Sequence, residues 1–508
     1  MTFGSTRRDR ICPKGCNSHW TATLALFSSR LGLKITLLLL FPFLSCSWSS
    51  KGTGDDDGIT IHLWTQDHWL GITGHELDGV KLDDPRRAQY TRKDWFNKVA
   101  AEFQALHPDK KIRIETEILD WTNGFQKIDI AVASGLPPDI LISTSGIALK
   151  YARFGLLEAF DDHLSPEDIA DFGPFYDFSE YEGKHYFLPF IGGSRYLLAN
   201  RKLFQERGVE HLLPSDGDRL WTMDQFLAAA QATTFDRDGD GKTDVWGFAL
   251  PFMRSSPQQD QMPFFWGYGA WQFNDRGDTL LLNSDAGTKA LQFLVDLEHK
   301  YRVIPPGSAG MRASDLSDLW NAGRLAMRSG FHGTKTAHER ALETGVIKQD
   351  VIDLYPLMYP SLPGIKPQVF VVADSPCVFR QSDPEKRRIT IAFAKFLTDT
   401  VHEREAAYAL STLPTRTSAV DVWSDDPYQQ YVLRMAKYGT KDGIQAYGIP
   451  LVNMTLNAFQ AAMAKQVEPR QALDDLTHRG NRFIHRDIER RSRVVMAEQQ
   501  PIRQAANE

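Results

Sequence analysis

The sequence has little cysteine, with four in 508 residues. Cys12 and Cys16 fall inside a predicted export signal, so only Cys46 and Cys377 remain for the mature protein. A single thiol beyond Cys46 can form neither an internal disulfide nor a thiolate metal site. Cys377 is therefore expected to be a small buried hydrophobic residue.

The chain also lacks a strong excess of one charge, with a formal net charge of -6 and scattered basic residues, so no nucleic-acid partner is expected. The sequence contains no HExxH zinc motif and no GxSxG nucleophile elbow. Gly241-Lys242-Thr243 resembles part of a phosphate-binding loop, but Asp236 stands where the first glycine is required. Length favours two or three domains, and 42% apolar residues predict ample globular core.

No apolar run near the N-terminus is long enough to span a membrane. The run from Ile35 to Leu44 has only half the length of a spanning helix, which needs about 20 residues. The basic stretch before it predicts a signal peptide over residues 1–45. Phe43-Leu44-Ser45-Cys46 is similar to a lipoprotein processing box, so Cys46 is the expected lipidation site and residues 46–58 a polar tether. The alternative is an ordinary cleavage site. Both place the mature protein outside the cytoplasm.

Beyond the tether, strand and helix patterns alternate. Residues 59–64 and 112–118 read as strands around a helix at 94–106, and a helix at 125–134 precedes a strand at 138–142. This order predicts a parallel α/β unit. Ligands of such sheets bind beyond the C-terminal ends of the strands.

A second pattern lies in YEGKHYFLPFIGGSRYLLANRKLFQERG, residues 181–208. Pro189 and the pair Gly192-Gly193 interrupt its apolar run, which predicts a strand broken in the middle. Such a segment suits a bendable crossing between two lobes.

Several segments follow one another in a recognisable order. They are AEFQALHPDKKIRIETE, IAVASGLPPDILISTSGIALKYARFGLLEAFDDHL, YEGKHYFLPF with LLANRKLFQERGV, DRDGDGKTDVWGFALP, NAGRLAMRSGFHG and LPTR. Each segment alone is a common pattern, but their order resembles the family of extracellular solute-binding proteins typified by maltose-binding protein. A long stretch between Trp69 and Thr91 and a basic end after Arg479 depart from this resemblance.

The resemblance implies an α/β fold of two lobes, of the periplasmic-binding-protein type II, joined by a multi-segment hinge. The N-lobe would comprise residues 59–188 plus 373–413, and the C-lobe residues 189–372 plus 414–508 with a basic tail. The implied function is a monomeric receptor of an ABC importer. It would bind a carbohydrate, expected to be an oligosaccharide, close over it at the hinge and deliver it to the membrane permease subunits. No cofactor and no catalysis are expected.

Aromatic and polar side chains at the predicted strand ends suit a sugar, whose rings present apolar C–H faces surrounded by hydroxyls. The tryptophans of FFWGYGAWQF are expected in a glycine-rich loop of the second lobe, and the resemblance puts a stacking aromatic at Phe331 or His332. Core packing is the alternative for tryptophan, and a hinge salt bridge is the alternative for Arg195. The predicted ligand-binding residues are Trp64, Asp67, Trp121, Thr144, Ser145, Arg195, Trp266, Trp271, Phe331 and His332.

An aspartate-rich loop has the spacing of a calcium site. Asp236, Asp238, Asp240 and Asp244 stand at positions 1, 3, 5 and 9 of an EF-hand-like loop, but position 12 is Gly247 instead of glutamate. Structural calcium and a solvated turn are both consistent with this pattern.

Two other functions stay open. A secreted carbohydrate-active enzyme would need a pair of carboxylates at a defined separation, which the sequence does not show. A receptor for a polyol phosphate would need more converging basic residues than the sequence places near Arg195.

Overall fold

The fold is described from a computed structural model, which covers residues 58–67, 92–120, 123–253, 258–440 and 443–505. Cys46, Trp121 and the stretch from Trp69 to Thr91 lie outside the described residues, as do the predicted signal and most of the tether. Within the described ranges, no helix has the length and hydropathy needed to cross a bilayer.

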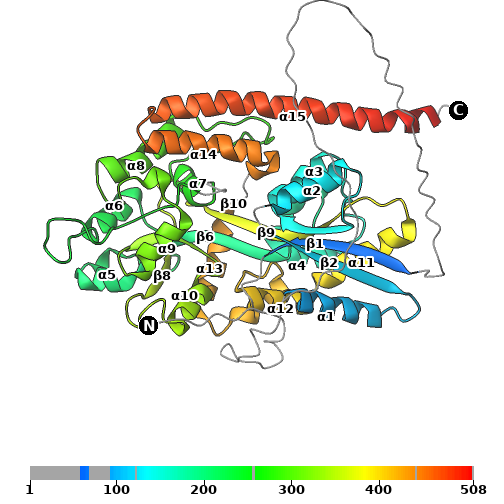
Figure 1. Cartoon of the computed structure of the whole chain (residues 1–508), viewed down its shortest axis with the longest axis horizontal. Helices are drawn as coiled ribbons and strands as arrows, with labels where there is room; N and C mark the ends of the chain where they lie inside the picture. The colour runs from blue at the N-terminus through cyan, green and yellow to red at the C-terminus, as the bar shows by residue number, and fades with distance from the viewer. Residues whose placement is uncertain (1–57, 68–91, 121–122, 254–257, 441–442, 506–508) are drawn as a thin grey trace, which may run out of the picture. The chain divides into compact units, whose positions relative to one another are not determined.

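An eight-stranded mixed sheet runs through the fold (Figure 1). Its main order is β2-β1-β3-β9-β6-β7, with β10 beside β9 and β8 beside β6. β1 pairs in parallel with β2 and β3, as the alternation of strand and helix patterns predicted. β9 is antiparallel to both β3 and β6. The strands are β1 (Ile59–Gln66), β2 (Ile112–Leu119), β3 (Ile140–Thr144), β6 (Ile191–Asn200), β7 (Met327–Phe331), β8 (Leu354–Leu357), β9 (Val369–Val378) and β10 (Gly439–Thr440).

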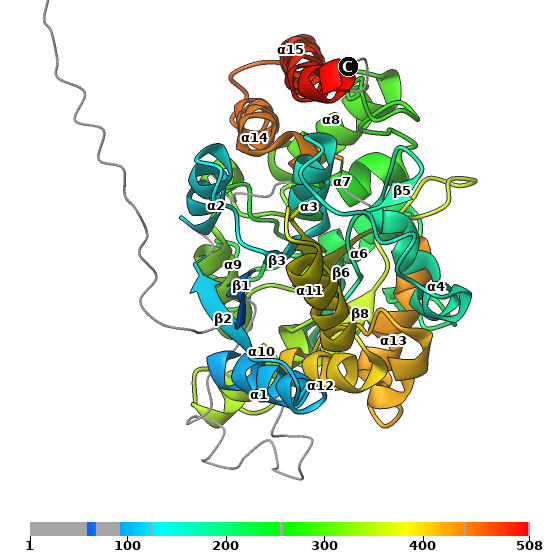
Figure 2. The same cartoon turned by 90° about the vertical axis from the view of Figure 1, so that its right-hand side faces the viewer.

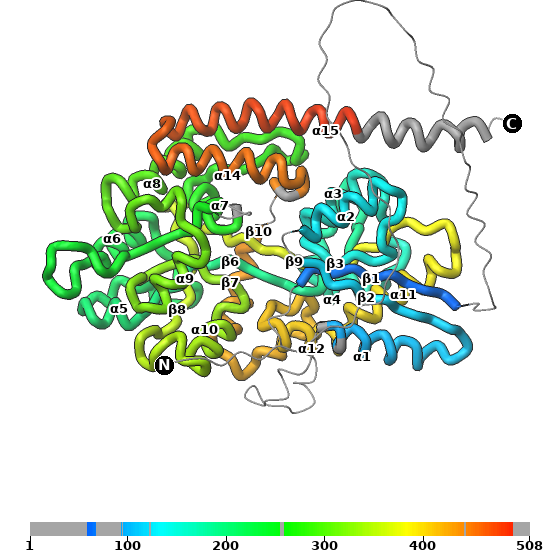
Figure 3. Tube along the Cα trace, in the orientation of Figure 1, coloured from blue at the N-terminus to red at the C-terminus, as the bar shows by residue number. Residues whose placement is uncertain are grey.

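The hydrophobic core is divided, and the division defines two lobes. In the N-lobe, Ile142 packs on one sheet face and Leu141 on the other, in two clusters whose members come mainly from residues before 192 and after 376. A separate large cluster around Tyr196 and Phe226 forms the C-lobe core. The two-lobed α/β fold is therefore as predicted, and Figure 3 traces the chain between the lobes. The residue-level lobe boundaries stay predictions.

Helices cover the sheet in both lobes (Figure 2). The N-lobe contains α1 (Arg92–Ala105), α2 (Gly124–Ala133), α3 (Ser145–Arg153), α4 (Pro166–Phe172), α11 (Pro384–Leu397) and α12 (Thr400–Leu410), with the 3-10 helices η3 (Gly173–Ser179) and η6 (Thr417–Trp423) and the hairpin β4 (Glu180–Tyr181) and β5 (Lys184–His185). The C-lobe contains α5 (Arg201–Glu206), α6 (Met223–Ala232), α7 (Gln258–Gly267), α8 (Asp285–His299), α9 (Ala313–Asn321), α10 (Thr334–Glu343), α13 (Pro427–Met435), α14 (Ile449–Met463) and α15 (Pro469–Ala505), with the 3-10 helices η4 (Glu210–Leu212), η5 (Ser308–Gly310), η7 (Ala436–Tyr438) and η8 (Gln445–Tyr447).

Three chain segments cross side by side between the two cores. β6 pairs with β9 from Ile191 opposite Asp374 to Ser194 opposite Val371. On the other edge of β6, the amide of Gly192 donates to the carbonyl of Leu413 at 3.0 Å, and the amide of Leu413 donates back at 2.8 Å. These three segments form the hinge.

The expected break within the crossing strand is wrong. β6 runs without interruption from Ile191 to Asn200, and neither Gly192 nor Gly193 has a positive φ. Both positions need glycine because neighbouring atoms leave no room for a Cβ atom. A Cβ on Gly192 would lie 2.4 Å from the carbonyl oxygen of Leu413, and one on Gly193 would lie 2.6 Å from Nδ1 of His332.

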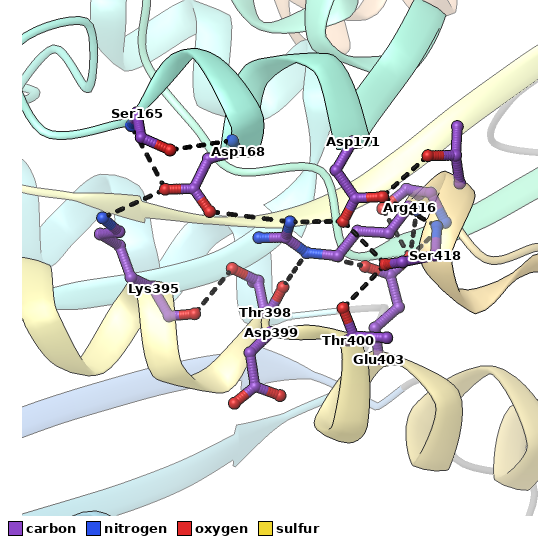
Figure 4. A network of polar contacts seen from close by, with 12 residues as sticks. Ser165, Asp168, Asp171, Lys395, Thr398, Asp399, Thr400, Glu403, Arg416 and Ser418 are labelled. Carbon is purple, nitrogen blue, oxygen red and sulfur yellow. Dashed lines mark hydrogen bonds and ion pairs between the residues drawn. The ribbon is translucent and has the colours of Figure 1, made fainter.

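A buried arginine anchors the third crossing (Figure 4). Arg416, three residues after Leu413, has a side chain 6% exposed. Its guanidinium donates to Asp171 at 2.9 Å, lies 3.9 Å from Glu403 and stacks 4.0 Å from the ring centre of Phe172. These partners are on α4 and α12, so the chain stays attached to the N-lobe just beyond the hinge.

Candidate functional site

Buried polar side chains gather where β1 and β3 end. The parallel register pairs Thr65 with Ile142, which makes Gln66 and Ser143 the next neighbours on one face. Both are 0% exposed, and neither Nε2 nor Oε1 of Gln66 nor Oγ of Ser143 has a hydrogen-bond partner among the residues described. Buried polar groups normally have partners, so these atoms have an unmet capacity for hydrogen bonds. Neither residue is among the ligand-binding residues predicted from the sequence.

The structure brings the predicted Thr144 and Ser145 next to this pair. Thr144 ends β3, and Ser145 begins α3, with exposures of 7% and 8%. Oγ1 of Thr144 has no hydrogen-bond partner within the part of the chain that is described. The ends of β1 and β3 and the start of α3 therefore form one buried polar cluster, the strand-end site, defined by Gln66, Ser143, Thr144 and Ser145.

Trp64 and Asp67 lie beside this site on β1 and just after it. The ring of Trp64 is half-buried, and the ammonium group of Lys127 on α2 lies 4.9 Å from its centre. The amide of Asp67 donates to the carbonyl of Leu119 at 2.9 Å, which joins the ends of β1 and β2. Both predictions of ligand contact stay predictions.

Three predicted residues of the C-lobe meet beyond the hinge. Arg195 on β6 pairs with Phe331 on β7, and its guanidinium lies 5.3 Å from the ring centre of Phe331. His332 packs against Gly193, as the close approach of its ring shows. We call Arg195, Phe331 and His332 the hinge cluster.

Contacts with α7 fix the direction of the Arg195 side chain. Its Nε and Nη2 donate to Oε1 of Gln259 at 3.2 and 2.9 Å, and Nε lies 4.0 Å from the fully buried carboxylate of Asp260. A guanidinium that is 15% exposed and held by α7 is preorganised within the C-lobe. This geometry is consistent with the alternative role, an ion pair that fixes β6 to α7 near the hinge. Ligand contact by Arg195 stays a prediction.

The two C-lobe tryptophans have different environments. Trp266 lies in α7, so the expectation that it occupies a loop is wrong, and its side chain is 1% exposed within the C-lobe core. The glycines suggested a loop, but Phe264 and Phe265 pack the helix into the core. Nε1 of Trp266 has no hydrogen-bond partner in the described part of the chain. Trp271 follows the helix and is 51% exposed.

Asp374, on the crossing strand β9, is a buried carboxyl group near the hinge with a shifted pKa. It lies opposite Thr144 on one side and Ile191 on the other. Burial raises the pKa of its carboxyl group to about 7. Its charge therefore depends on pH near neutrality.

The structure also shows a cavity of about 360 Å³ that no predicted ligand residue lines. Its walls come from α2 and α3 of the N-lobe and from η8, α14 and α15 of the C-lobe. The lining residues are Asp129, Lys150, Phe154, Ala446, Tyr447, Gly448, Ile449, Pro450, Phe483, Arg486, Asp487 and Arg490. The rings of Tyr447 and Phe483 come from segments more than 290 residues after α3, so no local pattern could have identified them.

The aspartate-rich loop gathers part of the predicted calcium set. Carboxylate oxygens of Asp236, Asp238 and Asp244 lie within 4.8 Å of one another, and Asp240 is outside this group. The amides of Gly239 and Gly241 donate to Asp236, which also suits a solvated turn. Calcium stays a prediction. Thermal unfolding with and without Ca²⁺ separates the two interpretations, because an ion bound to the folded state raises the melting temperature.

Cys377 is buried as predicted, with an exposure of 0%. Burial raises the pKa of its thiol to about 12.

Solved structures of binding proteins are similar to this fold. The maltose/maltodextrin-binding domain MalE from Bdellovibrio bacteriovorus, bound to maltotriose, superposes with a TM-score of 0.62 at 18% identity, covering 85% of this chain and 100% of that one. The cyclic α-maltosyl-1,6-maltose binding protein from Arthrobacter globiformis gives 0.64 at 15% identity, covering 84% and 99%. These likenesses show that the chain has the two-lobed fold of MalE-type proteins.

Family membership follows from the sequence match. The model of the bacterial extracellular solute-binding protein family matches residues 88–400. The chain belongs to this family.

Two curated relatives align over part of their length. The maltotriose-binding protein of Pyrococcus abyssi is 30% identical over 112 residues, which are 22% of this chain and 24% of that protein. The diacetylchitobiose binding protein DasA of Streptomyces coelicolor is 28% identical over 173 residues, which are 34% and 36%. The chain thus aligns with about a quarter to a third of these relatives.

Proposed function

We propose that this protein is a carbohydrate receptor of an ABC importer, which binds an oligosaccharide between its lobes and closes over it. The observation that carries the proposal is the strand-end site. Gln66, Ser143 and Thr144 bury polar atoms that lack partners in the described chain. A sugar can fill this need because each hydroxyl both donates and accepts hydrogen bonds.

The neighbours support a sugar over other solutes. The two curated relatives are named for binding maltotriose and diacetylchitobiose, and the Bdellovibrio domain was solved with maltotriose. The hinge cluster offers an aromatic ring beside a cation, which suits the C–H face and the hydroxyls of a sugar.

The proposed mechanism needs no chemistry on the solute. Ligand held at one lobe becomes buried when the other lobe swings in, and the closed form is the one that the permease subunits recognise. Lipidation at Cys46 would keep the receptor outside the cytoplasm at the membrane surface. Retained membrane association of a Cys46→Ala variant would contradict this part.

A thermal-shift screen tests the proposal. Neutral oligosaccharides, uronate-containing oligosaccharides, polyol phosphates and amino acids are compared at equal concentration. Oligosaccharides are expected to raise the melting temperature, because a ligand that binds only the native state stabilises it by mass action. A response restricted to polyol phosphates or amino acids would refute the sugar assignment.

Glycoside hydrolysis is measured in the same samples, because a secreted carbohydrate-active enzyme is the alternative. Turnover of an oligosaccharide by the protein would favour that alternative. Stabilisation without turnover supports the receptor.

A further inference from the structure

The cavity between α3 and α15 contains residues of both lobes. α15 is anchored in the C-lobe by Leu473, Leu476 and Ile484, and Asn481 exchanges hydrogen bonds with the backbone of Leu280. Figures 1 and 3 show α15 running above α14 toward the side of the fold that holds α2 and α3. Further along α15, the guanidinium of Arg490 lies 5.9 Å from the ring centre of Phe154, which follows α3.

The charges of the cavity do not balance. Lys150 pairs with Asp129, and Arg490 lies 3.7 Å from Asp487. The lining thus has three cations and two carboxylates, and the remaining charge is that of Arg486. Arg486 is exposed and makes no ion pair with any described residue. The cavity therefore has a net charge of about +1, and its surplus guanidinium can bind a carboxylate in a bidentate manner.

Aromatic rings supply the rest of the lining. The guanidinium of Arg153 lies 4.4 Å from the ring centre of Tyr447, whose hydroxyl donates to the carbonyl of Gly277. Phe154 and Phe483 add two more rings. Flat apolar surface beside a guanidinium matches a sugar ring that carries an acid group.

Helix α3 connects the cavity to the strand-end site. The helix begins at Ser145, in that site, and its last turn carries Lys150, with Phe154 directly after it. Nine helical residues span about 13 Å. A ligand that reaches both places must be longer than one sugar ring.

We propose that this cavity is a subsite for a carboxylated sugar unit, such as a uronic acid, of an oligosaccharide whose other end lies at the strand-end site. The proposal rests on the proposed function and deepens it. Arg486 binds the carboxylate, and Phe483 contacts the ring. The receptor therefore prefers uronate-containing oligosaccharides over neutral ones of equal length.

The test is calorimetric titration of the full mature protein with neutral and uronate-containing oligosaccharides of equal length. The variants are Arg486→Gln and, as a matched control, Arg482→Gln, since Arg482 is exposed one turn earlier and does not line this cavity. Arg486→Gln is expected to weaken uronate binding by about three- to tenfold and to leave neutral binding unchanged. Raising ionic strength from about 0.05 M to about 0.5 M should reduce the uronate preference of the wild type.

Three results would overturn the subsite. They are equal affinity for both ligands, an equal loss in both variants, and a loss that also affects neutral sugars. With neutral sugars still bound, these results leave the proposed function intact. Absence of binding by every oligosaccharide would overturn the proposed function and the subsite together.

Discussion

Replacing Gln66 by leucine should stabilise the unliganded protein and weaken ligand binding. The side chain is 0% exposed, and both amide atoms lack partners within the described chain. A buried polar group without a hydrogen bond costs about 1 to 3 kcal/mol. Leucine has a similar size and no polar atom, so the free energy of unfolding of the unliganded protein should rise by up to about this amount.

The same change removes two hydrogen-bonding atoms that we assign to the ligand. A loss of about 1 to 3 kcal/mol in binding corresponds to affinity that is weaker by about fivefold to about 150-fold. Urea unfolding followed by tryptophan fluorescence measures stability, and calorimetric titration with the best oligosaccharide of the screen measures affinity. A rise in stability together with a loss of affinity is the outcome that only our assignment of Gln66 predicts.

Gln104→Leu is the matched control. Its amide is satisfied, because Nε2 donates to the carbonyls of His107 and Lys110, and Oε1 accepts from the amide of Ile112. This variant should lose about 1 to 3 kcal/mol of stability and keep its affinity, since Gln104 lies near the start of β2 and far along the strand from the site. A Gln66→Leu variant that is destabilised like the control, or that binds sugar with wild-type affinity, would refute the assignment of Gln66.

Three further predictions concern the hinge. Arg416→Gln should lower the free energy of unfolding by about 3 kcal/mol or more, because it leaves the buried carboxylate of Glu403 without its cation. Arg404→Gln, which breaks an exposed ion pair, is the control and should cost less than about 1 kcal/mol in the same urea titration. Burial raises the pKa of the Asp374 carboxyl group to about 7, so wild-type stability should fall as pH rises from about 4 to about 7. Asp374→Asn should remove this part of the fall over the same pH range. Gly192→Ala should lower the melting temperature and the sugar affinity, because its Cβ would lie 2.4 Å from a carbonyl oxygen, and wild-type values of both would contradict the role of this contact in the hinge.

Local patterns predicted the elements that local physics determines. β1, α1 and β2 followed from the alternation and the helical spacing of their apolar residues, and the parallel pairing of β1 with β2 followed from their order. The first crossing was predicted near Gly192 for the wrong reason. A sequence shows two glycines, but it does not show that Leu413 and His332 approach them from segments more than 130 residues away.

The residues of the candidate site were less predictable because their significance depends on what is missing around them. Gln66 and Ser143 look like ordinary strand residues, and only the packed structure shows that their polar atoms have no partners in the described chain. Trp266 was misplaced for a different reason: its glycine-rich surroundings suggested a loop, but the side chain is buried in the C-lobe core. Arg486 stands out only because Asp129 on α2 and Lys150 on α3, in the other lobe, neutralise each other and leave its charge as the surplus.

The hinge explains why affinity and closure should be coupled in this protein. The strand-end site belongs to the N-lobe core and the hinge cluster to the C-lobe core, so each half is held rigid by its own packing. Arg416 fixes the third crossing to α4 and α12, while Gly192 pairs with Leu413 only three residues earlier. We expect any bending to be confined to a few residues of each crossing. A rotation there would change the distance between the strand-end site and the hinge cluster without changing either of them. A ligand that contacts both would then stabilise the closed form, because it binds that form more tightly than the open one.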